Sequence, residues 1–161
     1  MTEQMSVKIA ALPSLRLTVE AHGLMAKKAL GQNFLLDQNI TDKIINLSLQ
    51  KQNKKDFSGA NVFEVGPGPG GLTRAVLAAE PKSLTVVEMD ERCIAIMNEI
   101  KEKTGDILHI INGDAMQTDF SVLAPAPRHI ISNLPYNISV PLLVGWLKNI
   151  NAYDSLTLMF Q

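Results

Sequence analysis

The chain has 161 residues, of which 46% are hydrophobic and 19% are charged, and its formal net charge at pH 7 is -1. This length and hydrophobic content are enough for one globular domain with a real core, and they exclude a disordered chain. No apolar run approaches the length of a membrane span, and the first residues lack the layout of a secretory signal. We therefore expect a cytoplasmic protein without membrane contact.

Cysteine, histidine and methionine give no indication of a metal or redox site. Cys93 is the only cysteine, which excludes an internal disulfide and a cysteine-based metal cage. The three histidines share no metal-ligand spacing, so we expect no bound metal and structural roles for these residues. We expect the core to be filled in part by Met89, Met97, Met116 and Met159.

Residues 1–60 are expected to contribute helices and a cofactor-covering loop to the same domain as the rest of the chain. Ser14 is a suitable cap for a helix over residues 14–22. Ile40, Ile44 and Leu47, at helical spacing, mark a second helix. The segment 27–37 between them contains the sequence GQNFLLD, and core packing alone does not explain its mix of amides and apolar residues. The alternative is a packed connection at the sheet edge.

Charge is distributed unevenly along the chain. Residues 1–60 hold 8 Lys+Arg against 5 Asp+Glu, a net +3, whereas residues 61–161 hold 7 against 11, a net -4. The lysines of the first part are able to follow the phosphates of a nucleic acid. A solvated surface explains the same lysines equally well, so charge alone leaves the partner open.

After residue 60, short apolar runs alternate with longer amphipathic stretches, and this alternation is typical of a parallel α/β sheet. The apolar runs are rich in β-branched and aliphatic residues, as expected of strands covered on both faces. We predict strands over residues 61–65, 84–88, 107–111, 129–132 and 155–160. We predict helices over residues 70–79, 90–103 and 141–148, the last beginning at Pro141.

A glycine-rich turn with the sequence EVGPGPGG, residues 64–71, follows the first predicted strand. The spacing of its glycines, with Glu88 at the end of the next strand, also fits a dinucleotide fingerprint, so an NAD site has to be weighed. A pyrophosphate site works through backbone N–H groups, and Pro67 and Pro69 have none. The turn therefore favours a ligand without phosphates.

S-adenosylmethionine meets these requirements. Glycines such as Gly66 let the backbone pass close to its methionine portion, and the Glu88 carboxylate suits the ribose diol. Asp114, after the third predicted strand, supplies an acceptor for the adenine amine. Singly, Glu88 and Asp114 are also explained as an exposed strand end and a helix cap. Their order along the sheet favours the cofactor site.

The motif NLPYN, residues 133–137, follows the fourth predicted strand and matches the needs of methyl transfer to adenine. The lone pair of an adenine amine is spread into the ring, so an enzyme gains by binding the amine with its lone pair localised. The Asn133 side-chain oxygen and the Leu134 carbonyl suit its two N–H groups, held by the fixed φ of Pro135. Tyr136 offers a stacking face, and the proton is lost to water without a catalytic base. A strand-to-helix turn with the tyrosine in the core is the alternative.

The motifs GQNFLLD, EVGPGPGGLT, VVEMD, GDA and NLPYNIS, in this order, resemble the ribosomal RNA adenine N6-dimethyltransferase family. The resemblance implies an α/β fold of the class I S-adenosylmethionine-dependent methyltransferase (Rossmann-like) type. It also implies dimethylation of two adjacent adenosines near the 3′ end of 16S (small-subunit) rRNA in the immature subunit. The cofactor contacts of the family fall on Asn33, Leu35, Gly66, Glu88, Asp114 and Asn133. Its catalytic loop falls on Asn133, Leu134, Pro135 and Tyr136.

The resemblance also sets an expectation for the rest of the fold. The chain stops in or just after the fifth predicted strand, so residues 61–161 are expected to form an incomplete core without the two further strands and the C-terminal helical domain of the family. The edge beside the fifth predicted strand would then be unpaired, and we expect it to support oligomerisation. We expect such a fragment to bind the cofactor weakly and to be inactive on ribosomal subunits. A non-enzymatic assembly factor that keeps the fold without turnover is the alternative.

Overall fold

The computed structural model describes residues 4–24 and 36–160. Within them, five strands form one sheet in the order β3-β2-β1-β4-β5, and all its strand pairs are parallel. The strands are β1 (Asn61–Val65), β2 (Ser83–Glu88), β3 (Leu108–Asn112), β4 (Arg128–Asn133) and β5 (Ser155–Met159). The helices are α1 (Met5–Ala10), α2 (Leu15–Ala21), α3 (Gln38–Lys51), α4 (Gly71–Ala78), α5 (Glu91–Thr104) and α6 (Ser139–Lys148), with short 3-10 helices η2 (Ala115–Gln117), η3 (Phe120–Val122) and η4 (Ile150–Ala152). None of the described helices is long and apolar enough to cross a membrane.

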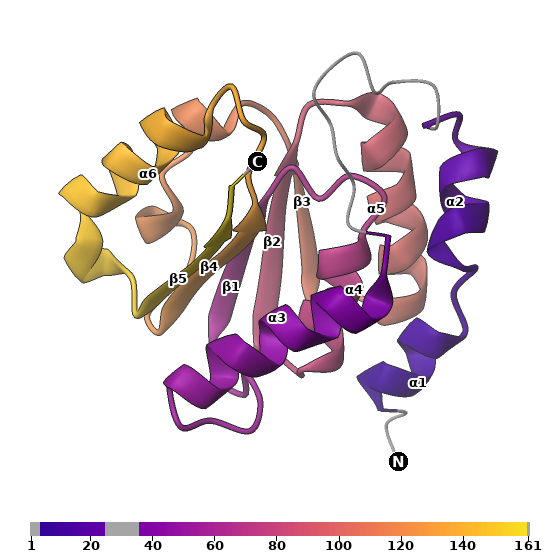
Figure 1. The fold of residues 1–161 in the computed structure, drawn as a ribbon, viewed down its shortest axis with the longest axis horizontal. Coiled ribbons are helices and arrows are strands. Elements are labelled where there is room, and N and C mark those ends of the chain that lie inside the picture. The colour runs from indigo at the N-terminus through magenta and orange to yellow at the C-terminus, as the bar shows by residue number, and fades with distance from the viewer. Residues whose placement is uncertain (1–3, 25–35, 161) are drawn as a thin grey trace.

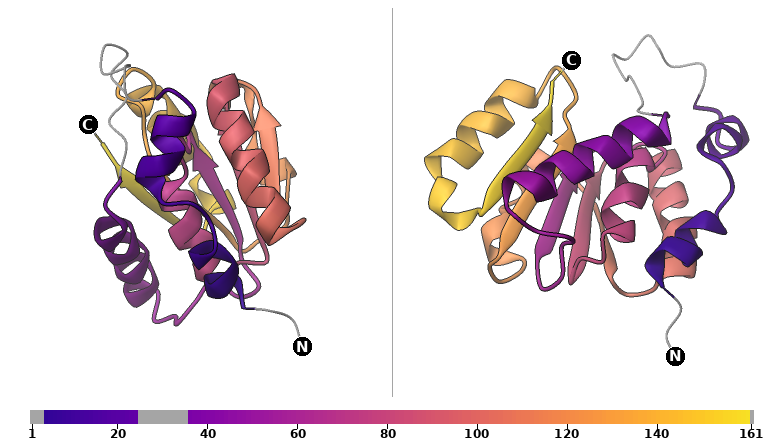
Figure 2. Two further views of the ribbon diagram at one scale, coloured as in Figure 1. Left: turned by 90° about the vertical axis from the view of Figure 1, so that its right-hand side faces the viewer. Right: turned by 60° about the horizontal axis from the view of Figure 1, so that its bottom comes forward.

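Helices cover the sheet on both faces, as Figures 1 and 2 show. Apolar residues of α1 to α5 form one core cluster with the sheet, and residues of η2, η3 and α6 form a second cluster on the other face. Val62 belongs to the first cluster and Phe63 to the second, as the alternation of side chains along a strand requires. All five residues of β1 are buried for this reason, and the predicted α/β fold class is confirmed.

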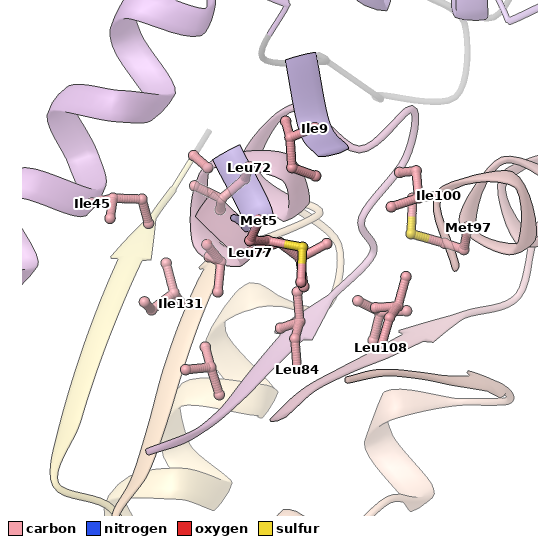
Figure 3. Packing of buried hydrophobic residues seen from close by; sticks show 14 of the residues in the cluster. Met5, Ile9, Ile45, Leu72, Leu77, Leu84, Met97, Ile100, Leu108 and Ile131 are labelled. Carbon is pink, nitrogen blue, oxygen red and sulfur yellow. The ribbon is translucent and has the colours of Figure 1, made fainter. Parts of the chain in front are cut away.

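The two clusters differ in the kind of side chain that fills them. The first is mainly aliphatic, and Figure 3 shows Met5 and Ile9 of α1 packed with Leu72 and Leu84. The second is built on aromatic rings. Phe63 and Phe120 stack with their centroids 4.7 Å apart, and Phe120 lies 6.3 Å from the ring of Trp146. Aromatic stacking thus fixes α6 and η3 against the sheet.

A buried arginine attaches the N-terminal helices to α4. The Arg74 guanidinium donates from Nη1 to the carbonyl of Pro13 at 2.7 Å and from Nη2 to Thr18 Oγ1 at 3.4 Å. Its Nε is the one buried side-chain polar atom without a partner among the described residues. Burial lowers the pKa of Arg74. Its side chain therefore holds the connection between α1 and α2 at the cost of an unsatisfied donor.

Strand β5 is an edge strand, and all of its residues are half-exposed. Helix α3 packs against it partly through polar groups. Ser48 Oγ lies 2.8 Å from Thr157 Oγ1, and Gln52 Nε2 donates to Ser155 Oγ at 3.4 Å. On the inner side, Ser155 Oγ lies 2.6 Å from Nδ1 of His129. His129 is buried, and burial lowers its pKa, which confirms a structural role for this histidine.

Two helices differ from the sequence prediction. Helix α1 was not predicted, because six residues are too few to show a helical period. Helix α6 begins at Ser139 and not at Pro141, so the proline occupies the third position of the helix. This is tolerated because the N–H groups of a first turn have no acceptor within the helix. The predicted helices over residues 14–22, 70–79 and 90–103 correspond to α2, α4 and α5.

Replacing Gly70 by alanine is expected to lower the free energy of unfolding by about 2–4 kcal/mol. Gly70 precedes α4 with a φ of +94°, and a Cβ there would lie 2.8 Å from Cδ1 of Ile100 and 3.1 Å from Cε of Met97. Gly59→Ala is the matched control, because Gly59 has a φ of +77° but no heavy atom within 4 Å of such a Cβ. The control should lose only about 1–2 kcal/mol. Equal losses in equilibrium urea unfolding would contradict the packing argument.

Candidate active site

The candidate site lies at the carboxyl edge of the sheet, on either side of β1. This strand pairs with β2 on one side and with β4 on the other. The order in which the chain adds strands to the sheet therefore reverses its direction at β1. Ligands of open parallel sheets bind at such a position. Four of the predicted residues, Gly66, Glu88, Asp114 and Asn133, end strands or follow them at this edge. Asn33 and Leu35 lie outside the described residues.

The glycine turn and the NLPY turn lie next to each other at the carboxyl ends of β1 and β4. Gly66 donates its N–H to the carbonyl of Val87 at 2.9 Å and has a φ of +64°. A Cβ at this position would lie 3.5 Å from Cγ of Pro135. The predicted cofactor turn and the predicted catalytic turn are therefore direct neighbours, although they are far apart in the sequence.

Glu88 connects the glycine turn with the turn after β2. Its Oε1 accepts from the backbone N–H groups of Met89 at 3.0 Å and Asp90 at 3.1 Å, and its Oε2 lies 3.4 Å from the N–H of Gly68. Its backbone carbonyl also accepts from Gly113 at 3.0 Å. Burial raises the pKa of Glu88, and the three N–H groups oppose that rise. The carboxyl group is therefore fixed in position beside the glycine turn.

Asp114 is exposed and caps the short helix η2. Its Oδ1 accepts from the N–H of Met116 at 2.9 Å. The alternative interpretation of Asp114 as a helix cap is thus correct in the structure. The cap also holds the carboxylate at the sheet edge, beyond the end of β3, where the adenine acceptor was predicted.

The NLPY turn begins with Asn133, the half-buried last residue of β4. Leu134 is buried and donates its N–H to Met159 of β5 at 3.0 Å. The carbonyl of Pro135 accepts from Ile138 at 3.2 Å, which closes the turn. Tyr136 is 64% exposed, so the alternative that places this tyrosine in the core is wrong. Its ring is available for stacking.

The hydroxyl group of Ser132 bridges β1 and β4 where their ladder ends. The register of the two strands runs only from Asn61 to Phe63. Beyond it, Ser132 Oγ donates to the carbonyl of Val65 at 2.7 Å and accepts from the Val65 N–H at 3.2 Å. The side chain is fully buried. Ser132 therefore takes the place of a backbone partner and lets the two strands separate just before Gly66 and Asn133.

Glu64 is a buried acid directly before the glycine turn, and sequence reasoning assigned it no role. Only 2% of the residue is exposed, and Oε1 accepts from Thr73 Oγ1 of α4 at 2.6 Å. Burial raises its pKa to about 8, against the effect of the Thr73 hydrogen bond. In the sequence, Glu64 is recognisable as an acid within the otherwise apolar run from Val62 to Val65.

No metal-binding or thiol chemistry is evident in this part of the fold. Cys93 is buried, and burial raises the pKa of its thiol to about 12. In the part of the chain that the structure describes, no group of three His, Cys, Asp or Glu side chains has the arrangement of metal ligands.

A profile of the family described as ribosomal RNA adenine dimethylase matches residues 23–161, which include all of these turns. The chain belongs to this family. Two relatives named ribosomal RNA small subunit methyltransferase A, from Gluconobacter oxydans and Allorhizobium ampelinum, are each 50% identical to this chain, over 151 and 154 residues. The matches cover 94% and 93% of this chain but 48% and 54% of the relatives. The chain thus spans about half the length of these relatives.

Solved structures agree with this assignment. A dimethyladenosine transferase from Plasmodium falciparum matches with a TM-score of 0.63 and 30% identity, over 78% of this chain and 42% of that one. An S-adenosylhomocysteine-bound methyltransferase from Podospora anserina matches with a TM-score of 0.56 and 16% identity, over 92% and 65% of the two chains, and shows the fold alone. The predicted Rossmann-like methyltransferase fold is confirmed.

Three exposed apolar side chains lie in the turns that carry the candidate site residues. Met89, Met116 and Tyr136 are 67%, 42% and 64% exposed. Each of them follows a predicted site residue by one to three positions. The prediction that Met89 and Met116 fill the core is wrong, because the chain has already left the sheet at both positions. Met97, in contrast, is fully buried as predicted. Exposed apolar groups beside fixed polar ones are typical of a ligand-binding edge.

Replacing Ser132 by alanine is expected to lower the free energy of unfolding by about 1–3 kcal/mol, because the N–H and carbonyl groups of Val65 lose their buried partner. Ser121→Ala is a suitable control, since its hydroxyl group donates to Asp119 at an exposed site. The control should cost about 0.5 kcal/mol or less. Equilibrium urea unfolding compares the two variants, and a Ser132 variant as stable as the control would exclude the bridging role.

Proposed function

We propose that this chain carries the cofactor-binding and catalytic part of an S-adenosylmethionine-dependent enzyme that dimethylates the N6 amine of adenine in small-subunit rRNA. The observation that carries the proposal is the proximity of the glycine turn at Gly66 to the NLPY turn at Pro135. A methyl donor and its acceptor have to meet in one place, and the two turns suited to hold them are neighbours in the fold. Membership of the dimethylase family supports the same activity.

The residues at the edge suit the three parts of the proposed cofactor. The methionine portion would lie along the glycine turn, the ribose diol on Glu88, and the adenine amine on Asp114. The three strands that carry these groups are adjacent in the sheet in the order β1, β2, β3. The Glu88 carboxyl group is already fixed by backbone N–H groups, and Asp114 is exposed at the edge. Asn33, Leu35 and Asn133 are proposed to complete the cofactor contacts.

The catalytic roles follow from the groups of the NLPY turn. When bound, S-adenosylmethionine supplies a sulfonium methyl group as the electrophile. Asn133 and the carbonyl of Leu134 accept the two N–H groups of the target amine and localise its lone pair, with Pro135 fixing the turn. Tyr136 stacks on the base, and the proton leaves to water, so no side-chain base or metal is needed. Alignment of this kind lowers barriers by roughly 7–11 kcal/mol in favourable cases.

The finer assignment concerns the substrate and the setting of the reaction. We propose two adjacent adenosines near the 3′ end of 16S rRNA as the targets, in the immature small subunit and in the cytoplasm, with a role in subunit maturation. The relatives named ribosomal RNA small subunit methyltransferase A support a small-subunit rRNA substrate. An NAD-dependent oxidoreductase is disfavoured by Pro67 and Pro69, which offer no N–H groups to a pyrophosphate. A non-enzymatic assembly factor would need neither Asn133 nor the exposed Tyr136.

The 161-residue chain by itself is expected to bind the cofactor weakly, or only when stabilised by self-association, and not to methylate ribosomal subunits. All proposed cofactor contacts lie before residue 134, whereas its net charge of -1 provides few phosphate contacts for a structured RNA. We propose that residues 1–60 and 61–161 act as one domain and that the half-exposed edge at β5 supports self-association of this chain.

Asn133→Ala is expected to lower the rate of methyl transfer by about 10²–10³-fold, because one acceptor of the target amine is lost. Cofactor affinity should fall only modestly. The assay measures radiolabelled methyl transfer to immature small subunits by the chain extended with the remaining part of the Gluconobacter oxydans relative. Asn98→Ala, at an exposed position of α5, is the control. Near-normal turnover by the Asn133 variant would show that the proposed role is wrong.

Glu88→Ala is expected to weaken S-adenosylmethionine binding by about ten- to hundredfold, because charge-assisted hydrogen bonds of about 1.5–3 kcal/mol are lost. Glu102→Ala, at an exposed position of α5, should bind normally. Isothermal titration calorimetry measures both variants. NAD should leave the melting temperature of the wild-type chain unchanged, and a thermal shift with NAD but none with S-adenosylmethionine would reverse the choice of cofactor.

A further inference from the structure

The carboxyl group of Glu88 is held mainly by the short turn between β2 and α5. Its Oε1 accepts the backbone N–H groups of Met89 and Asp90, the two residues of this turn. The remaining contact, from the N–H of Gly68 to Oε2, is longer at 3.4 Å. A turn fixes a side chain only as well as the turn itself is fixed. The position of this carboxyl group therefore depends on what holds Asp90.

Arg92 holds Asp90 through both its backbone and its side chain. The Arg92 N–H donates to Oδ1 of Asp90 at 2.9 Å, which caps α5. The guanidinium group then spans both carboxylate oxygens, from Nε to Oδ1 at 3.1 Å and from Nη2 to Oδ2 at 2.7 Å. Two parallel hydrogen bonds of this kind fix the planes of both groups. The turn that carries Asp90 is therefore held in one orientation.

The third nitrogen atom of the guanidinium group attaches this arrangement to the end of α2. Arg92 Nη1 donates to the carbonyl of Gly23 at 3.1 Å. Arg92 thus donates from each of its three side-chain nitrogen atoms, although the side chain is partly exposed. Ion pairs that water reaches contribute little to stability. The arrangement is better explained by the geometry that it imposes on Asp90.

A second contact between α2 and α5 has no such connection to the candidate site. Nε2 of His22 lies 3.1 Å from Oε1 of Glu99. Glu99 follows Arg92 by seven residues on the same helix, so both lie on one face, about 10 Å apart along the axis. Both contacts attach α2 to α5, but the Arg92 contact also continues through Asp90 to Glu88. The two contacts therefore allow attachment of α2 to be distinguished from positioning of Glu88.

We propose that Arg92 is a positioning residue for cofactor binding, which acts through Asp90 to hold the Glu88 carboxyl group where the ribose of the cofactor binds. The inference rests on the proposed function, which assigns the ribose diol to Glu88. In this role Arg92 makes no cofactor contact of its own, because its nitrogen atoms are engaged with Asp90 and Gly23. Without it, the carboxyl group has to be ordered during binding, which lowers affinity.

A double-mutant cycle with Glu88, measured by isothermal titration of S-adenosylmethionine into the 161-residue chain, tests this role. Arg92→Ala is expected to raise the dissociation constant about three- to tenfold. In the Glu88→Ala background the same change should have no further effect, since no carboxyl group is left to position. Arg92→Lys keeps the charge but not the planar fork, so it should bind as weakly as Arg92→Ala. The test therefore does not depend on the alanine variant alone.

Glu99→Ala is the matched control, because it removes the other contact between α2 and α5. Equilibrium urea unfolding should show small and similar changes for Glu99→Ala and Arg92→Ala, whereas Glu99→Ala should bind the cofactor normally. S-adenosylhomocysteine and its 2′-deoxy analogue provide a second readout. Arg92→Ala should weaken binding of the analogue less than binding of S-adenosylhomocysteine, since part of the ribose contact is already missing.

Several outcomes would overturn the positioning role and leave the proposed function intact. These are an equal loss of affinity on Arg92→Ala with and without Glu88, normal binding by Arg92→Lys, or a loss by Glu99→Ala as large as that by Arg92→Ala. Absence of S-adenosylmethionine binding by the wild-type chain, or normal binding by Glu88→Ala, would instead overturn the proposed cofactor site and this inference together.

Discussion

Pairing of β1 with β2 on one side and β4 on the other organises the edge of the sheet at which the described candidate residues lie. The strand is buried along its whole length, and its two parallel neighbours bring their carboxyl ends to the same edge. Residues that are up to 67 positions apart, such as Val65 and Ser132, become hydrogen-bonded neighbours there. Because both faces of the sheet are covered by helices, this edge is where a ligand approaches the strand ends.

The turns at this edge begin in a similar way. Gly66 donates its N–H to Val87, Gly113 donates to Glu88, and Leu134 donates to Met159. In each case, the first residue after a strand bonds to a residue at or near the end of the adjacent strand. The sheet ladder thus extends into the turns and fixes their directions. This explains how turns rich in glycine and proline hold carboxyl and amide groups in defined places.

The sequence was sufficient to predict the order of the strands and of the helices from α2 onward, because these depend on local periodicity, and turn motifs indicated four candidate residues that the structure brings to one edge of the sheet. The sequence did not indicate the bridging role of Ser132, because that role depends on where β1 and β4 separate in the folded protein. It was also insufficient for Glu64, since burial of one acid among apolar residues is a tertiary property. The exposure of Met89 and Met116 was missed for the same reason. Composition identifies apolar side chains but not the point at which the chain leaves the sheet.

Two buried titratable groups limit the pH range in which the empty fold is most stable. Burial lowers the pKa of His129 from 6.5, so its contribution to stability is complete above that pH and is lost as the pH falls toward the folded-state value. Glu64 acts in the opposite direction. Its pKa rises from 4.5 to about 8, so its contribution is complete below 4.5 and is lost as the pH rises toward 8. His129 thus contributes to the loss of stability in acid from the amino end of β4, and Glu64 contributes to the loss in alkali from the functional edge.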